Sequence, residues 1–139
     1  MQDPTWPGSG ITSAKNVKLA ALIDRGIGEF RYTYDMGDDW RHTIAVKGVG
    51  PGEPNVKYPC FVDGERRCPP EDVGGPPGFE LFLDTMADPA HEDHRRLRDW
   101  HGGSYNPEDI DERAIRRALA AIALRRHAGQ LAYRESRLQ

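Results

Sequence analysis

Aromatic and β-branched residues alternate with polar residues on both sides of an acidic turn between Phe30 and Val46. The alternating residues are Phe30, Tyr32 and Tyr34 before the turn and Trp40, His42, Ile44 and Val46 after it. Successive side chains of a strand point to opposite faces, so a period of two predicts two strands that each have one apolar face. Residues 36–39, Met-Gly-Asp-Asp, are typical of a turn in which Gly37 adopts a positive φ. The pattern predicts an antiparallel hairpin over about residues 30–47.

Residues 48–78 contain seven glycines and seven prolines, a composition that excludes a long helix or a central strand. A loop of this length in a compact domain is usually either functional or disordered. Phe61 and the turn pair Asp63-Gly64 provide an apolar anchor and turn chemistry. These residues favour an ordered segment.

Helices are expected on both sides of this region. Ser13 is a candidate N-cap for a short first helix, which would end at Gly26 or Gly28. After the loop, Phe79 begins a helical apolar stripe, and Asp88 followed by proline predicts a helix that runs to about Trp100. The last helix is expected to start at Asp111, with the apolar stripe Ile115, Ala118, Leu119 and Ile122.

These elements predict an α+β fold, in which a small antiparallel sheet built on the hairpin is packed by the C-terminal helices. The expected organisation is an irregular lead-in at residues 1–12, a single α+β domain at 13–127 and a basic C-terminal tail at 128–139.

The charge is unevenly distributed. Residues 113–139 carry seven arginines and one acidic residue, a net charge of +6, whereas the other 112 residues carry 12 basic and 21 acidic side chains, a net charge of −9. General nucleic-acid binders spread basic charge across a face of the fold, so nucleic acid is a possible partner only for the arginine-rich C-terminal helix. A solvated helix face is the simpler interpretation of these arginines.

No apolar run approaches the roughly 20 residues of a membrane span, and no charged-then-apolar leader opens the chain. The chain has 2 cysteines and no secretion signal, which argues against a disulfide scaffold. The expected compartment is the cytoplasm, and no membrane partner is expected.

Acidic residues cluster at two places. Asp35, Asp38 and Asp39 lie at the hairpin turn beside a histidine, where carboxylates can bind a cation or act in acid–base chemistry. The same aspartates can instead hydrogen-bond to the turn backbone, and the histidine can be a structural, half-buried residue. Pro69–Gly75 is either a rigid connector or an acidic loop near the hairpin. The candidate binding residues are Asp38, Asp39, Trp40, His42, Glu71 and Asp72. No residue is assigned a catalytic role, and no cofactor is expected.

Two cysteines and two histidines suggest a weaker hypothesis, a zinc site formed by Cys60, Cys68, His91 and His94. Zinc ligands usually lie closer together, two to four residues apart for cysteine pairs and three to five for histidine pairs. The spacing therefore gives this hypothesis little weight.

Residues 32–42, YTYDMGDDWRH, resemble the Y-x-Y-D-F-G-D-D-W-x-H signature of the plasmid pRiA4b Orf-three-like protein family. Residues 68–75, CPPEDVGG, resemble its CPPED-x-GG loop, and the patterns FL, DP-x-HE-x-H and W-x-GG follow in order and spacing. The resemblance runs from about Lys18 to Leu119. It implies an α+β fold, a bacterial origin linked to mobile elements and no established biochemical role.

The chain departs from the family pattern in two ways. Family members usually begin with a further strand–helix–strand section that has no counterpart here, and Arg116 stands where the family tends to have asparagine. If the missing section normally pairs with the hairpin, one sheet edge is left open, and open edges recruit other strands. We therefore expect self-association by strand pairing across a twofold axis.

The favoured function is a non-enzymatic protein-interaction module whose partner is an unknown protein or a second copy. GxSxG, HExxH, phosphate-loop and kinase signatures are all absent from the sequence. One alternative is a metal-dependent hydrolase or nucleic-acid-processing enzyme that uses Asp38, Asp39, His42, Glu71 and Asp72. Another is a DNA-associated protein of mobile elements that binds through its C-terminal helix.

Overall fold

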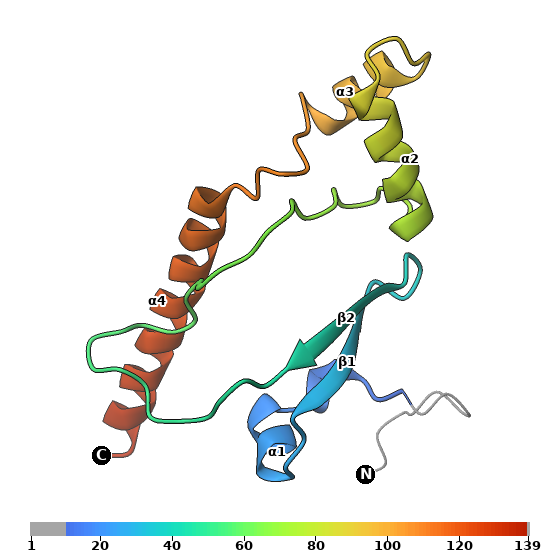
Figure 1. Ribbon diagram of the computed structural model, residues 1–139. Coiled ribbons are helices and arrows are strands. Elements are labelled where there is room, and N and C mark those ends of the chain that lie inside the picture. The colour runs from blue at the N-terminus through green and yellow to red at the C-terminus, as the bar shows by residue number, and fades with distance from the viewer. Residues whose placement is uncertain (1–10, 139) are drawn as a thin grey trace. The chain divides into compact units, whose positions relative to one another are not determined.

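Two strands joined by an acidic turn form the sheet (Figure 1). β1, Glu29–Tyr34, pairs antiparallel with β2, Trp40–Ala45, in a register that places Tyr32 opposite His42. The structure is a computed structural model that describes residues 11–138, and within that range the sheet consists of these two strands. The alternation of aromatic and polar residues therefore predicted both strands and their pairing to within a residue or two.

The segment before the hairpin forms two short helical pieces rather than one helix. A 3-10 helix, η1, spans Ala14–Asn16, and α1 spans Leu19–Asp24. Val17 and Lys18 have extended backbone between them, which breaks the helical hydrogen-bond ladder. Ser13 precedes η1 without a side-chain capping bond, so its predicted role as a helix cap is wrong. Gly26, with φ 74°, follows α1 as predicted for a helix end.

The chain divides into two units, Met1–Gly50 and Pro51–Gln139, at a point within the Gly- and Pro-rich segment. The predicted single domain at residues 13–127 includes parts of both units. That domain assignment, and the packing of the C-terminal helices on the sheet, stay predictions. Most of the predicted lead-in at residues 1–12 lies outside the described residues.

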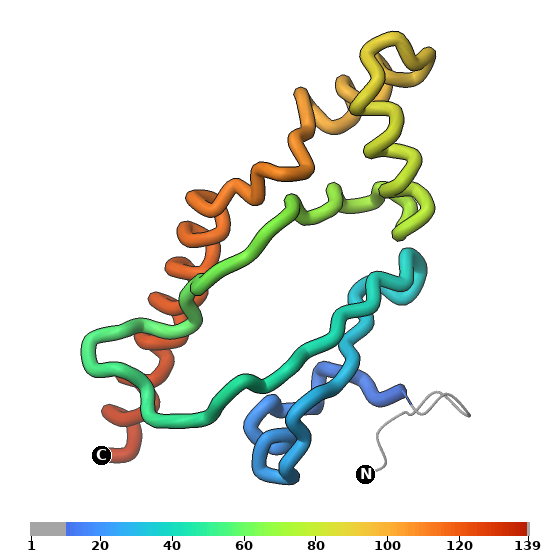
Figure 2. Tube along the Cα trace, in the orientation of Figure 1, coloured from blue at the N-terminus to red at the C-terminus, as the bar shows by residue number. Residues whose placement is uncertain are grey.

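In the second unit, the chain from residue 51 to 74 has no helix or strand; its first part lies beside α4, Glu112–Ser136, and its last part leads to α2 (Figure 2). Arg116 joins the two, because its Nη1 donates to the Phe61 carbonyl at 3.3 Å and its guanidinium lies 5.3 Å from the Phe61 ring centroid. This contact supports the prediction of an ordered segment. α4 also extends further than expected, since residues 128–136 of the predicted tail are helical.

Phe82 is the centre of the second unit's core. It lies on α2, Gly75–Ala87, and is 1% exposed. Its ring makes edge contacts with Trp100 and His101 of α3, His94–His101, at centroid distances of 5.9 and 5.7 Å, and with Tyr105 at 5.1 Å. The predicted apolar stripe thus packs on aromatic residues further along the chain. The α+β fold class is confirmed: residues 11–138 contain four α-helices and the two-stranded antiparallel sheet.

α3 begins later than the sequence indicates. Asp88 was expected to cap a helix that runs to about Trp100, but its Oδ1 accepts from the Ala90 N–H at 2.9 Å within a turn. His91 N–H bonds to the Asp88 carbonyl at 3.0 Å, and helix geometry resumes only at His94. The predicted start is wrong because the aspartate satisfies a local turn instead of a first helical turn. Gly102, with φ 88°, ends α3 close to the predicted end near Trp100.

None of the described helices is both long enough and apolar enough to cross a membrane.

Candidate functional site

The hairpin turn is built by its own aspartates. Asp35 Oδ1 accepts hydrogen bonds from the backbone N–H of Gly37 at 3.0 Å and Asp38 at 3.2 Å, and the Asp35 carbonyl accepts from Asp39 N–H at 2.7 Å. Asp35 and Asp39 adopt positive φ values of 52° and 55°. Gly37 does not, so the prediction that glycine supplies the left-handed residue is wrong. Aspartate tolerates that region because its side chain can bond to the nearby backbone.

Asp39 forms the hairpin's ion pair with Arg41. Arg41 Nε donates to Asp39 Oδ1 at 3.1 Å, and Arg41 Nη2 lies 2.6 Å from Oδ2. The hydrogen bond from Arg41 lowers the pKa of the Asp39 carboxyl, with a smaller contribution from the arginine's charge. Both side chains are exposed, so water screens the pair. Asp39 is thus held ionised and oriented along β2.

The aromatic side of the hairpin is accessible. Tyr32 and His42 are directly opposite each other, with ring centroids 5.9 Å apart and planes tilted by 42°. Tyr32 is 40% exposed and Tyr34 is 45% exposed, and His42 is exposed rather than half-buried. Trp40 lies opposite Tyr34 in the strand register. The hairpin therefore presents accessible aromatic rings next to charged turn residues.

Glu71 and Asp72 belong to the second unit, in the turn that leads into α2. Both side chains are exposed, and Asp72 has φ 58°. Gly74 caps α2 with φ 95°, and a side chain at Gly78 would lie 2.1 Å from the Val73 carbonyl oxygen. The glycines of this segment therefore let the loop lie against the first turn of α2. This packing fits a connector, and the exposed Glu71 and Asp72 side chains leave the predicted binding role untested.

The two acidic segments lie in different units. Among the residues described, no group of three or more His, Cys, Asp or Glu side chains has a geometry that could hold a metal ion. The suggested zinc ligands are not brought together. Cys60 and Cys68 are free and exposed. His91 Nδ1 accepts from the Asp93 N–H at 3.1 Å, and His94 Nδ1 lies 2.9 Å from the Thr85 carbonyl oxygen. Both histidines thus contact groups of α2 or of the segment that joins α2 to α3.

Sequence reasoning missed a cluster around Tyr105. The Tyr105 hydroxyl donates to the carbonyls of Arg67 at 3.1 Å and Cys68 at 3.2 Å, and burial raises the pKa of this phenol. Arg67 Nη1 donates to the Asp109 carbonyl at 3.1 Å, and the Arg67 guanidinium lies 5.8 Å from the Tyr105 ring centroid. An open cavity of about 430 Å³ lies beside these residues. No local pattern could have revealed the cluster, because Arg67 and Tyr105 are separated by 38 residues.

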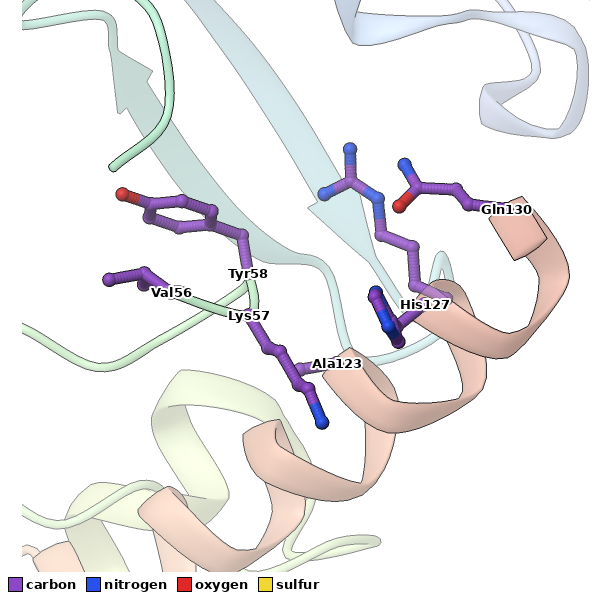
Figure 3. A pocket seen from close by; sticks show the side chains of 7 residues that line it. Val56, Lys57, Tyr58, Ala123, His127 and Gln130 are labelled. Atoms are coloured by element: carbon purple, nitrogen blue, oxygen red, sulfur yellow. The ribbon is translucent and has the colours of Figure 1, made fainter. Parts of the chain in front are cut away.

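A smaller hollow lies between the long loop and α4 (Figure 3). Its volume is about 110 Å³, and its lining includes Lys57 and Tyr58 from the loop and Ala123, His127 and Gln130 from α4. Figure 3 shows the lining residues of the loop beside those of α4, with the Tyr58 ring extending away from the helix. Its basic side chains are Lys57 from the loop and Arg126 and His127 from α4, so the side of α4 that faces the loop is partly polar.

Comparison with known proteins identifies the family. The model of the family described as plasmid pRiA4b ORF-3-like protein matches residues 2–114. The chain belongs to this family. The match ends near the start of α4, so most of that helix lies beyond the matched residues.

Two similar proteins have been described without a function. The uncharacterized protein y4hQ of Sinorhizobium fredii (strain NBRC 101917 / NGR234) is 40% identical over 105 residues, which is 75% of this chain and 53% of that protein. The crystal structure of the protein of unknown function MM3350 from Methanosarcina mazei Go1 matches with a TM-score of 0.65 and 33% identity, over 74% of this chain and 58% of that chain. The chain therefore spans about half the length of the curated relative.

Proposed function

We propose that this pRiA4b ORF-3-like chain is a non-enzymatic protein-interaction module that pairs the open edges of its hairpin with a strand of another polypeptide. The observation that carries the proposal is the two-stranded sheet of residues 11–138. An isolated two-stranded hairpin is only marginally stable in water, and a third strand or a packed layer stabilises it. Each strand here has one edge without a neighbouring strand in the described chain.

The register indicates which backbone groups are available. The Val46 N–H donates to the Gly28 carbonyl at 2.8 Å, and these residues extend the pairing of Glu29 with Ala45. Hydrogen-bonded pairs alternate along an antiparallel ladder, so Tyr32 and His42 also form such a pair. The intervening residues direct their N–H and C=O groups outward: Arg31 and Thr33 on β1, and Arg41 and Thr43 on β2. These groups form the proposed pairing edges.

Side chains beside these edges would add specificity. In the hairpin, the proposed contact residues are Asp38, Asp39, Trp40 and His42. The exposed rings are of the kind enriched at protein interfaces, and the Asp39 carboxylate, whose pKa is lowered by Arg41, suits the polar rim of such an interface. Glu71 and Asp72 are proposed as a further contact segment on the second unit. The first partner to test is a second copy of the chain, because the same edge can pair with itself across a twofold axis.

The metal-dependent alternative has less support. The carboxylate of Asp35 accepts from turn amides, and that of Asp39 binds Arg41, so both already have protein partners. Calorimetric titration with magnesium, manganese and zinc addresses this alternative directly. Stoichiometric binding of any of these ions that is lost in Asp38→Asn would favour it over the interaction module.

Sedimentation equilibrium tests the proposal at micromolar concentrations. Thr43→Pro removes an outward N–H from β2 while leaving the bonds between β1 and β2 in place, since proline is tolerated at strand edges. Thr43→Val is the matched control, because it keeps that N–H and the β-branched shape. We expect the unmodified chain and Thr43→Val to self-associate and Thr43→Pro or the corresponding Arg31→Pro to do so less. A monomeric unmodified chain would count against self-pairing.

A further inference from the structure

α4 presents an apolar seam that the second unit does not cover. Leu124 and Leu131 lie seven residues apart and are 55% and 46% exposed. Ala121 lies three residues before Leu124, and Ala128 lies three residues before Leu131, which is the alternating three- and four-residue spacing of a heptad. Glu135 occupies the next position of this spacing, so the apolar seam ends at Leu131. Two helical turns take about seven residues, so Ala121, Leu124, Ala128 and Leu131 lie on one face of α4.

The other face of α4 is the one its own unit uses. Ala123 is 4% exposed and lines the hollow opposite the loop (Figure 3). Arg116 donates to the Glu112 carboxylate within α4 and to the Phe61 carbonyl of the loop. Successive residues in a helix are about 100° apart, so Leu124 and Ala128 are rotated by roughly 100° and 140° from Ala123, to one side of this contact. α4 therefore has one face tied to the loop and one outward face with a regular apolar seam.

Unpaired positive charge flanks the seam. Arg113 and Arg117 lie on α4 before the seam begins, and Arg125 and Arg134 lie on either side of it. None of these four side chains forms an ion pair within residues 11–138. In paired helices, charges beside the apolar seam determine which partner and which orientation are accepted. The outward face of α4 thus combines a leucine and alanine seam with arginines that form no ion pair within the described residues.

We infer that this seam docks an amphipathic helix of a protein partner whose flanking residues are acidic. The inference rests on the proposed function and names a class of partner for it, on a surface separate from the hairpin edges. The partner's apolar residues would pack on Leu124 and Leu131, and the alanines would allow close approach of the two backbones. Its acidic side chains would pair with Arg125 and Arg134.

Three other occupants fit the seam less well. A second copy would bring two arginine-rich flanks together, and like charges in an interface cost affinity. A lipid surface is usually bound by a wide apolar face that contains aromatic residues, whereas this seam is narrow and aliphatic. DNA would use the arginines but would leave the exposed leucines without a role. The experiments below give a different result for each of these occupants.

The test measures binding of two synthetic helical peptides of three heptads to the full chain by fluorescence anisotropy. Both peptides have leucine at the seam positions; one has glutamate and the other lysine at the flanking positions. We expect the glutamate peptide to bind, and its affinity to fall as salt is raised. The lysine peptide should bind at least roughly tenfold more weakly, as expected from like-charge juxtaposition. Equal binding of the two peptides, or no binding, would overturn the inference.

Variants locate the binding surface. Leu124→Gln and Leu131→Gln keep helix propensity, and each should weaken the glutamate peptide by roughly tenfold or more because a buried leucine is lost from the interface. Leu81→Gln on α2 is the matched control, because Leu81 is 62% exposed and lies outside the seam. It should bind as the unmodified chain does. Circular dichroism of each variant checks that α4 remains helical. Unchanged binding by helical Leu124→Gln and Leu131→Gln would overturn the inference.

The other occupants give distinct results. Binding of duplex DNA that falls in Arg125→Gln but not in Leu124→Gln would contradict a helix partner, as would tighter binding to anionic vesicles than to the peptide. Self-association that is lost in Leu124→Gln would assign the seam to a second copy instead. Failure here is separable from failure of the proposed function, because Thr43→Pro alters the hairpin edge and leaves α4 unchanged. Peptide binding without self-association through the hairpin edge would contradict the proposed edge pairing alone. Self-association through that edge without peptide binding would contradict the helix-docking inference alone.

Discussion

Two helices of the second unit contain an interior glycine, and the surroundings of the two glycines are opposite. At Gly78 in α2, an added Cβ would lie 2.1 Å from the Val73 carbonyl oxygen. At Gly129 in α4, an added Cβ would meet no atom within 4 Å. Gly78 is thus required by the chain that packs on it, whereas Gly129 is required by no contact within the described chain.

The contrast extends to the side chains around each glycine. Phe82, one turn after Gly78, is 1% exposed, whereas Leu131, two residues after Gly129, is 46% exposed. Packing of buried side chains therefore stabilises α2, whereas the C-terminal half of α4 is stabilised mainly by helix propensity and by the length of the helix. A helix that retains exposed leucines at regular spacing without using them in its own core is available to a partner. Four substitutions test this contrast, from the largest expected effect to the smallest.

Phe82→Ala removes the ring around which the second unit packs. We expect it to lower the free energy of unfolding by about 3–5 kcal/mol, the usual cost of deleting a buried phenylalanine. Leu124→Ala is the comparison on α4 and should change stability by about 0.5 kcal/mol or less, because that side chain is 55% exposed. Urea denaturation measures both. Similar losses at the two positions would break the contrast between the helices.

Gly78→Ala places a methyl group against the Val73 carbonyl, and the loop must move to accept it. Overpacking of this kind costs about 1–3 kcal/mol. The loss of stability should be visible in the same denaturation experiment. A stabilised Gly78→Ala protein, as helix propensity alone would give, would show that the loop does not lie on α2 as described.

Asp111→Ala removes the cap that starts α4. Asp111 Oδ1 accepts from the Ala114 N–H at 3.2 Å, and loss of such a cap costs about 0.5–2 kcal/mol. Asp111→Asn is the control, because asparagine keeps a capping oxygen and tolerates the left-handed backbone, φ 53°, at this position. We expect near-normal stability for Asp111→Asn. Equal losses in the two variants would mean that the charge, not the cap, matters.

Gly129→Ala should stabilise the protein by roughly 0.5–1 kcal/mol, because alanine loses less backbone entropy in a helix and nothing crowds the new methyl group. The denaturation midpoint is expected to rise without a change in slope. A destabilised Gly129→Ala protein would indicate that this part of α4 is already packed against something, in contradiction to the exposed seam.

The sequence predicted those parts of the fold that depend on neighbouring residues. The strands followed from the alternation around Tyr32, and the start of α4 followed from Asp111, because period and capping are local properties. The start of α3 was wrong since Asp88 can cap either a turn or a helix, and the choice depends on bonds that sequence does not show. The hairpin turn was predicted in place but not in detail, because Asp35 rather than glycine supplies its special backbone geometry.

The candidate site was less predictable than the fold. Sequence indicated the acidic residues of the turn but could not show that Asp39 is already paired with Arg41. The cluster around Tyr105 joins residues far apart in the chain, so no local pattern reveals it. The zinc hypothesis failed for the same reason: residue types and spacing do not determine which side chains meet.

Amide hydrogen exchange tests the central claim, that the hairpin edges are the interaction surface, most directly. The informative amides are the outward N–H groups of Arg31 and Thr33 on β1 and of Arg41 and Thr43 on β2, compared with the inward N–H groups of Tyr32 and His42. If a strand of another copy pairs with the hairpin, protection of the outward amides on at least one strand rises with protein concentration. The proline variant on that strand, Arg31→Pro for β1 or Thr43→Pro for β2, reduces that rise. Outward amides that exchange rapidly at every concentration, in a chain that associates by other means, would contradict the account.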